Sequence, residues 1–270
     1  MRIAALPMYD LPELREQTDA LWAALARAMT DEGVPGVPAT LDRALHHREV
    51  WSHPRLLIAQ TCGYPLVRAL AGRVRVVATP RYEVPECVGA WYTSRVLVPA
   101  SSPARTLEDV AGAVCAANEI DSHSGMNGLR ALLAPLAGRR GGRFFSRVVW
   151  SGGHRASLEL LARGEVEVTC VDSISFALTA RVRPDLTEGT REIARTVPCP
   201  GLPLITPAGA SDDEIARMRA AVARVMDEPD TAEVRRDLLL GGVEVLPDGA
   251  YHKVVELEEE AVRLGYPALA

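Results

Sequence analysis

Two serines, a histidine and a glycine open one predicted helix of this chain, and such a group can hold an anion. The segment DSHSGMN follows a predicted strand, and its candidate ligand-binding residues are Ser122, His123, Ser124 and Gly125. A serine can cap the first turn of a helix with its side-chain oxygen, and the backbone N–H groups there attract negative charge. One serine is enough for a cap. Two serines beside a histidine therefore favour an oxyanion site, with simple capping as the alternative.

A second stretch, residues 148–173, reads as strand, glycine turn, helix and strand. Gly153 and His154 follow its first strand, and Asp172 follows its second strand. A βαβ connection brings these two points to the same edge of a parallel sheet, and open α/β sheets bind ligands at that edge. His154 would supply a hydrogen-bond donor and Asp172 an acceptor or a negative charge. The alternative is an ordinary βαβ unit in which the glycines only form the turn.

Comparable loops follow two predicted strands nearer the N-terminus. Tyr9 follows the first of them, while Thr61 and Tyr64 follow the second, at residues 55–59. We expect these three residues to contact the same ligand, because each lies at a strand end. Cys62 lies in the same loop, where a small side chain that admits the ligand is the alternative to a reactive thiol.

Proton transfer is the alternative chemistry for these residues. His154 or His123 could act as acid or base, with Asp172 orienting one of them. The sequence contains no nucleophile elbow, phosphate-binding loop or dinucleotide fingerprint, so we expect no cofactor. Two adjacent histidines, His46 and His47, lack a carboxylate or cysteine at ligand spacing, so no metal is expected.

The composition excludes several classes of partner. The chain has 30 Lys and Arg against 35 Asp and Glu, a net charge of -5, so it has no basic excess for nucleic acid. No run of 18 apolar residues occurs, so we expect no membrane insertion. Five cysteines without a CxxC pair are neither a disulfide framework nor a metal motif.

The N-terminus bears on localisation. A predicted strand at residues 3–6 begins almost at once, without an apolar region followed by a small-residue cleavage site. This predicts a cytoplasmic protein as the sequence is written. A periplasmic or cell-surface protein is the alternative if a signal peptide was removed.

Alternation of strands and helices predicts an α/β protein with two lobes. The lobes are joined by two crossing segments, near residues 95–99 and 198–205. The first lobe is discontinuous, at residues 1–97 plus 203–270, because the chain returns to it for the C-terminal helices. The second lobe is expected at residues 98–202. Ligand loops of both lobes are expected to face one cleft.

The chain resembles the phosphate/phosphite/phosphonate substrate-binding proteins of ABC transporters, over about residues 3–245. The resemblance is carried by an ordered set of segments, which are QTCGYPL (60–66), YTSRVLV (92–98), TLEDVAG (106–112), DSHSGMNGLR (121–130), the stretch from Ser151 to Ser173 and PGLPLIT (200–206). It implies a type 2 periplasmic-binding-protein fold, in which two α/β sheets are joined by two crossing segments around a central ligand cleft.

The resemblance also implies roles for residues of the second lobe. In such proteins the serine-rich helix start holds the phosphoryl oxygens, which matches Ser122, Ser124 and Gly125. The glycine–histidine turn, matching His154, and the carboxylate after the next strand, matching Asp172, complete that lobe's contribution.

Two further features bear on the ligand. A first-lobe tyrosine closes over the ligand in the family, and Tyr64 and Tyr9 are the candidates here. His123 interrupts the serine/threonine run of the family, so a carboxylate or sulfonate is an alternative to phosphonate, phosphate or phosphite.

Three functions remain open from the sequence. The first is a solute-binding protein that closes on a small anionic ligand and serves an ABC transporter permease. The second is a cytoplasmic enzyme on the same fold, of lyase or dehydratase type, with a histidine as acid or base. The third is a sensor whose closed form docks a signalling or membrane partner. Fold alone does not decide among them.

Overall fold

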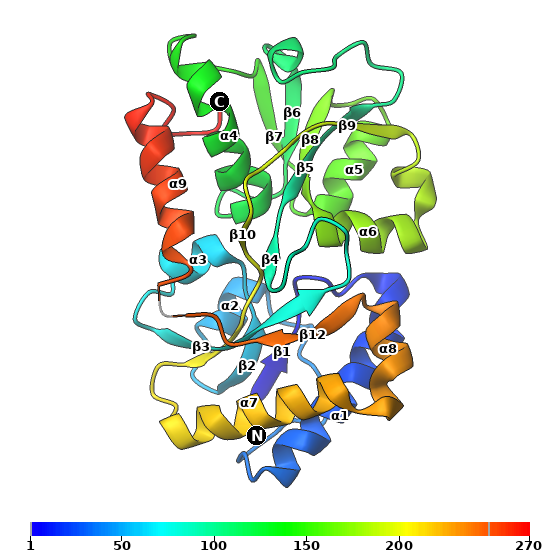
Figure 1. Cartoon of the computed structure of the whole chain (residues 1–270), viewed down its shortest axis with the longest axis vertical. Coiled ribbons are helices and arrows are strands. Elements are labelled where there is room, and N and C mark those ends of the chain that lie inside the picture. The colour runs from blue at the N-terminus through cyan, green and yellow to red at the C-terminus, as the bar shows by residue number, and fades with distance from the viewer. Residues whose placement is uncertain (1, 248) are drawn as a thin grey trace. The chain divides into compact units, whose positions relative to one another are not determined.

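The chain forms two compact α/β units in a computed structural model that describes residues 2–247 and 249–270. Unit 1 consists of Met1–Ala90 with Pro200–Asp248, and unit 2 of Trp91–Cys199 with Gly249–Ala270. The fold class is therefore the expected one, with two mixed sheets (Figure 1).

The boundaries of the units differ from the expected lobes of residues 1–97 plus 203–270 and 98–202. The last helix, α9 (His252–Arg263), belongs to unit 2, because it packs against α4 (Gly128–Gly138) and buries Val254 and Ala261 (Figure 1). The chain passes between the units after residues 90, 199 and 248, which is three times instead of two.

Unit 1 is built on a five-stranded sheet. Its strand order is β1 (Ile3–Ala5), β2 (Leu56–Gln60), β11 (Leu204–Pro207), β3 (Val74–Tyr82), β12 (Leu240–Glu244). The strands β1 and β2 are parallel, whereas β11 and β12 run antiparallel to their neighbours. All five residues of β2 are buried, as expected for the apolar run LLIAQ.

Helices cover this sheet. They are η1 (Pro12–Leu14), α1 (Arg15–Asp31), α2 (His47–Trp51), α3 (Gly63–Val67), α7 (Asp212–Asp227), η5 (Pro229–Thr231) and α8 (Ala232–Asp237). The inner face of α1 buries Leu21, Trp22, Leu25 and Met29, which is the stripe that the helical spacing predicts. The notable feature of this part of the chain is strand β12, where the spacing of the residues predicts a helix to about Leu240 and then a turn at Gly241-Gly242. The helix ends at Asp237 instead, and Gly241-Gly242 then enter an extended strand beside β3.

Unit 2 has a second five-stranded sheet. Its strand order is β7 (Arg147–Trp150), β6 (Val114–Ala117), β8 (Val168–Asp172), β5 (Ser94–Pro99), β9 (Thr190–Arg195). Strands β7, β6 and β8 are parallel, and β5 is antiparallel to β8. The carboxyl ends of three strands and the start of β5 therefore share one edge of the sheet.

The helical segments of unit 2 fix the loops at that edge. They are η2 (Glu108–Val110), the π-turn η3 (His123–Asn127), α4, α5 (His154–Ala162), α6 (Ser173–Val182), η4 (Pro184–Leu186) and α9. A core cluster joins α5 to the sheet through Leu158 and Leu161, which pack with Leu97, Ala116 and Val171. Two short strands, β4 (Trp91–Tyr92) and β10 (Cys199–Pro200), pair with each other.

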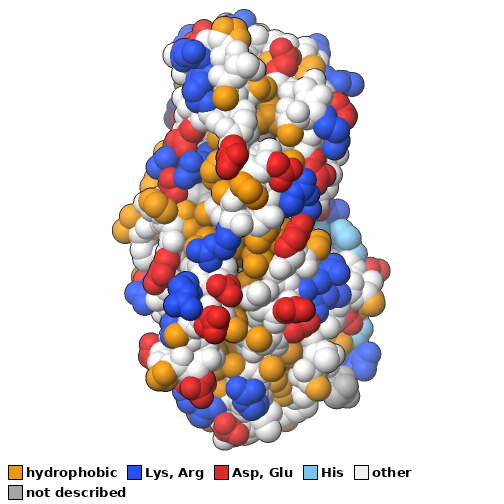
Figure 2. Space-filling view, turned by 90° about the vertical axis from the view of Figure 1, so that its right-hand side faces the viewer, with side chains coloured by type: hydrophobic (Ala, Val, Ile, Leu, Met, Phe, Trp, Pro, Cys, Tyr) orange, Lys and Arg blue, Asp and Glu red, His pale blue; other side chains and the backbone are white. Residues whose placement is uncertain are grey.

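Charges of both signs are mixed on the surface that Figure 2 shows, with acidic and basic side chains interspersed among apolar ones. That face carries no continuous basic stripe of the kind that binds nucleic acid. Among the described residues, no helix combines the length and the apolar character that a membrane crossing requires.

Candidate functional site

The predicted site residues of unit 2 lie at the carboxyl edge of its sheet. The segment Ser122–Gly125 follows β6, and His154 begins α5 directly after the turn that follows β7. Asp172 is the last residue of β8 and the N-cap of α6. Parallel strands thus bring together side chains that are up to 50 residues apart in the sequence.

His154 is the centre of this group. Its Nε2 atom lies 2.8 Å from the Oγ of Ser124 and 3.1 Å from the Oδ2 of Asp172. The side chains of His154 and Asp172 are only 11% and 3% exposed. Imidazole, hydroxyl and carboxylate therefore form one buried polar cluster.

The protonation of this cluster follows from its geometry. An ionised carboxylate only accepts hydrogen bonds, so the Nε2 atom beside Asp172 must carry a hydrogen. Ser124 contacts the same nitrogen, so its hydroxyl hydrogen is not given to the ring and can be donated to a ligand. In a hydrolytic triad the serine and the carboxylate contact opposite ring nitrogens. The cluster therefore lacks the arrangement of a serine hydrolase.

Burial lowers the pKa of His154 below its ordinary value of 6.5. Asp172, the backbone carbonyl of Cys170 and Glu119 act in the opposite direction. The neutral ring is thus favoured by desolvation, while three neighbours favour the imidazolium. A bound anion would add a fourth influence toward the charged form.

Asp172 is held by two contacts within unit 2. Its Oδ1 accepts a hydrogen bond from the backbone N–H of Ser175 at 2.8 Å, and its Oδ2 faces His154. Both oxygens are therefore paired within unit 2, and the carboxylate does not need a donor from the ligand. Asp172 caps α6 and orients the imidazole.

Ser122 is a cap and also lies beside the cluster. Its Oγ accepts from the backbone N–H of Gly125 at 3.2 Å and lies 3.3 Å from the Oγ of Ser124. Both serines are buried, at 5% and 4% exposure. The two interpretations of this serine pair, cap and polar site, are therefore compatible.

Gly125 is required by close packing. A Cβ atom at this position would collide with the side-chain oxygen of Asn118 and would lie 3.2 Å from the carbonyl oxygen of Cys170. The thiol of Cys170 in turn lies 3.4 Å from the carbonyl of Ser124. The π-turn therefore rests directly on the end of β8.

His123 lies in different surroundings from His154. It is 4% exposed, and burial lowers its pKa to about 4. Its Nδ1 lies 3.2 Å from the Nδ2 of Asn127. At neutral pH the ring is therefore uncharged and cannot serve as a proton-donating imidazolium.

Three other predicted residues lie in unit 1. Tyr9 follows β1, and Thr61 and Tyr64 follow β2; because these strands are parallel, both loops lie at the same sheet edge. Tyr9 is 8% exposed and packs edge-on against Tyr82, with ring centroids 5.1 Å apart. That these residues contact the same ligand as those of unit 2 stays a prediction.

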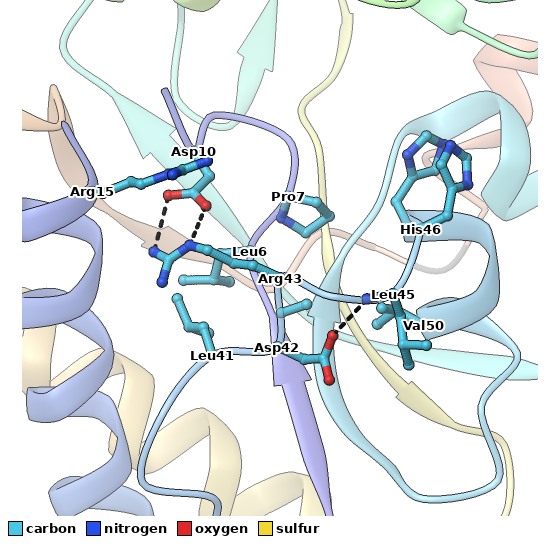
Figure 3. Close-up of a pocket in the computed structure, with 12 residues that line it drawn as sticks. Leu6, Pro7, Asp10, Arg15, Leu41, Asp42, Arg43, Leu45, His46 and Val50 are labelled. Carbon is cyan, nitrogen blue, oxygen red and sulfur yellow. Dashed lines mark hydrogen bonds and ion pairs between the residues drawn. The ribbon is translucent and has the colours of Figure 1, made fainter. Parts of the chain in front are cut away.

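Unit 1 also contains a hollow of about 270 Å³ between the β1 loop and α2 (Figure 3). Arg43 points into it and is held by both carboxylate oxygens of Asp10, at 2.5 and 3.1 Å (Figure 3). A second carboxylate, Asp19, lies 2.7 Å from the same guanidinium. Asp10 and Asp19 keep the pKa of Arg43 above its ordinary value, and they also neutralise its charge. No predicted site residue lines this hollow.

Thr93 is a site candidate that sequence reasoning missed. It is 6% exposed, and its hydroxyl has no hydrogen-bond partner among the described residues. Thr93 precedes β5, and its carbonyl accepts from the N–H of Ser173, next to Asp172. The segment was interpreted as an extended connection between lobes, and its sequence does not show that the strand starting here pairs antiparallel with β8. A buried hydroxyl without a partner is costly unless a ligand or water satisfies it.

Buried hydroxyls and an imidazole thus gather at the carboxyl edge of the sheet of unit 2, where open α/β sheets bind ligands. The chain belongs to a family described as the periplasmic substrate-binding protein of phosphonate ABC transporters, whose model matches residues 3–251. This confirms the resemblance and makes the chain a solute-binding protein. A comparison with curated proteins found no match.

Solved structures of the same fold include two phosphonate-binding proteins. A binding protein component of an ABC phosphonate transporter from Pseudomonas aeruginosa is 14% identical, with a TM-score of 0.77, and the match covers 98% of this chain and 87% of that chain. PhnD1 from Prochlorococcus marinus, in complex with methylphosphonate, is 11% identical, with a TM-score of 0.76, and the match covers 97% and 98%. A protein from Xanthomonas citri bound to ATP is 15% identical, with a TM-score of 0.70, covering 97% of each chain. At these identities the likeness shows the two-lobed fold.

Proposed function

We propose that unit 2 binds a phosphonate, phosphate or phosphite group through Ser122, Ser124 and His154, and that the ligand leaves unchanged. The observation that carries the proposal is the shared contact of Ser124 and Asp172 with one ring nitrogen of His154. This contact leaves the serine hydroxyl able to donate, which suits an oxygen-rich anion. It does not provide the relay of a covalent enzyme.

The backbone around the cluster supports the same proposal. Helix α5 starts at His154, so its N-terminus, with partial positive charge, lies at the same edge as the hydroxyls. The hydroxyl of Thr93, which has no hydrogen-bond partner in the described part of the chain, adds a further donor at that edge. We therefore propose that Thr93 also contacts the ligand.

Isothermal titration calorimetry with methylphosphonate, phosphate, phosphite, sulfate and acetate tests the proposal. We expect Ser124→Ala to weaken binding of the preferred anion by roughly 0.5–1.5 kcal/mol, the usual contribution of one hydrogen bond. Ser146→Ala is a matched control, because Ser146 lies in unit 2 immediately before β7, at the opposite end of the strand from the site. Equal affinity of Ser124→Ala and the parent for every anion would overturn the proposal.

We further propose that the chain works in the periplasm and delivers its ligand to an ABC transporter permease. The support is the family, whose members are the periplasmic binding components of such transporters. Fractionation of cells that express the natural gene tests the location. Recovery of the protein only with the cytoplasmic fraction would contradict it.

A further inference from the structure

Asn127, the last residue of the π-turn, is fully buried and connects that turn to the C-terminal part of unit 2. Its Nδ2 donates to the backbone carbonyl of Val254 in α9 at 3.0 Å. Its Oδ1 accepts from the Nη2 of Arg130 at 2.5 Å. A carbonyl can only accept and a guanidinium can only donate, so these two partners fix which way the amide points.

The fixed amide determines the state of His123. The Nδ2 of Asn127 is a donor, and it lies 3.2 Å from the Nδ1 of His123. The Nδ1 atom must therefore accept, which leaves the ring hydrogen on Nε2. Burial of this ring, with its pKa lowered to about 4, agrees with a neutral imidazole.

Arg130 extends the connection to the end of the described chain. Its side chain is 5% exposed, its Nη1 donates to the carbonyl of Pro267 at 2.6 Å, and its Nη2 lies 3.4 Å from Glu258 of α9. A buried guanidinium is costly unless it is paired and hydrogen-bonded. Here Nη1 and Nη2 are paired, whereas Nε has no hydrogen-bond partner among the described residues. Helix α9 and the segment after it are therefore tied to η3 through Val254, and to α4 through Glu258 and Pro267.

The π-turn needs such support. A π-turn carries one residue more than an α-helical turn, is rare and is usually held by its surroundings. A change of this turn to an α-helical turn would alter the directions of its side chains. The Oγ of Ser124 would then move away from the Nε2 of His154, now 2.8 Å distant. The contacts of Asn127 thus oppose a rearrangement that would disperse the hydroxyl cluster.

We infer that Asn127 and Arg130 are positioning residues, through which α9 holds Ser122 and Ser124 in the geometry that binds an oxyanion. The inference rests on the proposed function for its ligand. It assigns a role in binding to residues that lie outside the polar cluster. The inference also assigns α9 a function within unit 2, which is to support the π-turn.

The test compares Asn127→Ala, Glu258→Ala and Glu258→Gln with the parent, using methylphosphonate in calorimetry and heat denaturation for stability. We expect Asn127→Ala to weaken binding by about tenfold or more, which is about 1.4 kcal/mol. We expect Glu258→Ala to weaken it less, and Glu258→Gln to restore most of the loss. Tyr266→Phe is the control, because it removes the two hydrogen bonds between the Tyr266 hydroxyl and the backbone of Ala270 in the same segment, and Asn127 is not a partner in either.

Nitrogen NMR of His123 in the ligand-free protein gives a second readout. We expect the parent to show the Nε2–H tautomer alone and Asn127→Ala to show a mixture. The inference is overturned if Asn127→Ala binds methylphosphonate with the affinity of the parent. It is also overturned if the loss of affinity follows the fall in melting temperature in every variant, Tyr266→Phe included. If Asn127→Ala does not fold, the affinities of Glu258→Ala and Glu258→Gln test the inference instead. If the parent binds none of the anions, the proposed function fails. If the parent binds and Asn127→Ala binds equally well, the positioning role alone fails, and an unchanged His123 tautomer would refute the assigned Asn127–His123 hydrogen bond.

Discussion

The two buried histidines of unit 2, His123 and His154, show how the surroundings of a side chain determine its role. His154 faces a serine and a carboxylate, and the charge of that carboxylate, Asp172, favours the charged ring against burial. His123 faces the amide of Asn127, and burial is the cause of its low pKa. The first ring can respond to an anion by binding a proton, whereas the second is a neutral part of the packing.

The low pKa of His123 should make the free energy of unfolding depend on pH in the acid range. Its folded pKa of about 4 lies below the unfolded value of 6.5, so between these values the unfolded chain binds a proton that the folded chain does not. Stability is therefore fully present above pH 6.5 and is lost as the pH falls toward 4, by up to about 3 kcal/mol. We expect His123→Gln, measured by urea unfolding at several pH values, to have a flatter profile over that range than the parent. Parallel profiles would contradict the assignment.

Gly125 and Gly153, in the two turns of the site, differ in how much space is left for a Cβ atom. Gly125 has no room for a methyl group beside Asn118 and Cys170, whereas Gly153 is extended, with φ 178°, and has open space around a Cβ. We expect Gly125→Ala to lower the unfolding free energy by roughly 1–3 kcal/mol, the usual effect of overpacking. Gly153→Ala should change it by less than about 0.5 kcal/mol, as at ordinary surface positions. Urea denaturation of both variants is the measurement, and equal effects would show that the packing at Gly125 is not tight.

Strand ends were the part of the site that the sequence could predict. Ser124, His154 and Asp172 each follow an apolar run that forms a parallel strand, and parallel strands must end at the same edge. Thr93 could not be found this way, because β5 is antiparallel and brings its start, not its end, to that edge. The contacts of Asn127 were also inaccessible, since they depend on α9, more than 120 residues later.

Assignment of the C-terminal helix to the wrong lobe has a similar cause. The apolar stripe of α9 predicts a helix that packs on another element. The stripe does not say which unit supplies the partner surface. Helix α4 supplies it here, and the polar contacts of Asn127 and Arg130 with Val254 and Glu258 carry no periodic signal.

At the scale of the whole molecule, the family defines a protein that binds a solute, and the chain contains the fold of that family along almost its full length. Three features fit that class. The chain has two α/β units and a net charge of -5, and none of the described helices is long and apolar enough to cross a membrane. What separates this chain from an enzyme on the same fold is whether the ligand changes. That question requires an experiment on the intact protein.

Ligand binding should stabilise the whole protein without consuming the ligand. A ligand present at one hundred times its Kd adds about 2.7 kcal/mol to the folded state, so the melting temperature rises measurably. An anion favours the imidazolium of His154, whose pKa lies below 6.5 in the free protein, so its contribution to affinity falls as the pH rises through the pKa that the bound state reaches. We expect His154→Gln, which keeps a donor, to retain part of the thermal shift and to lose this component of the pH dependence. Mass spectrometry of the ligand after long incubation with the parent should find it unchanged at each pH. Conversion by the parent that disappears in His154→Gln would instead identify a lyase-type enzyme with His154 as its acid or base.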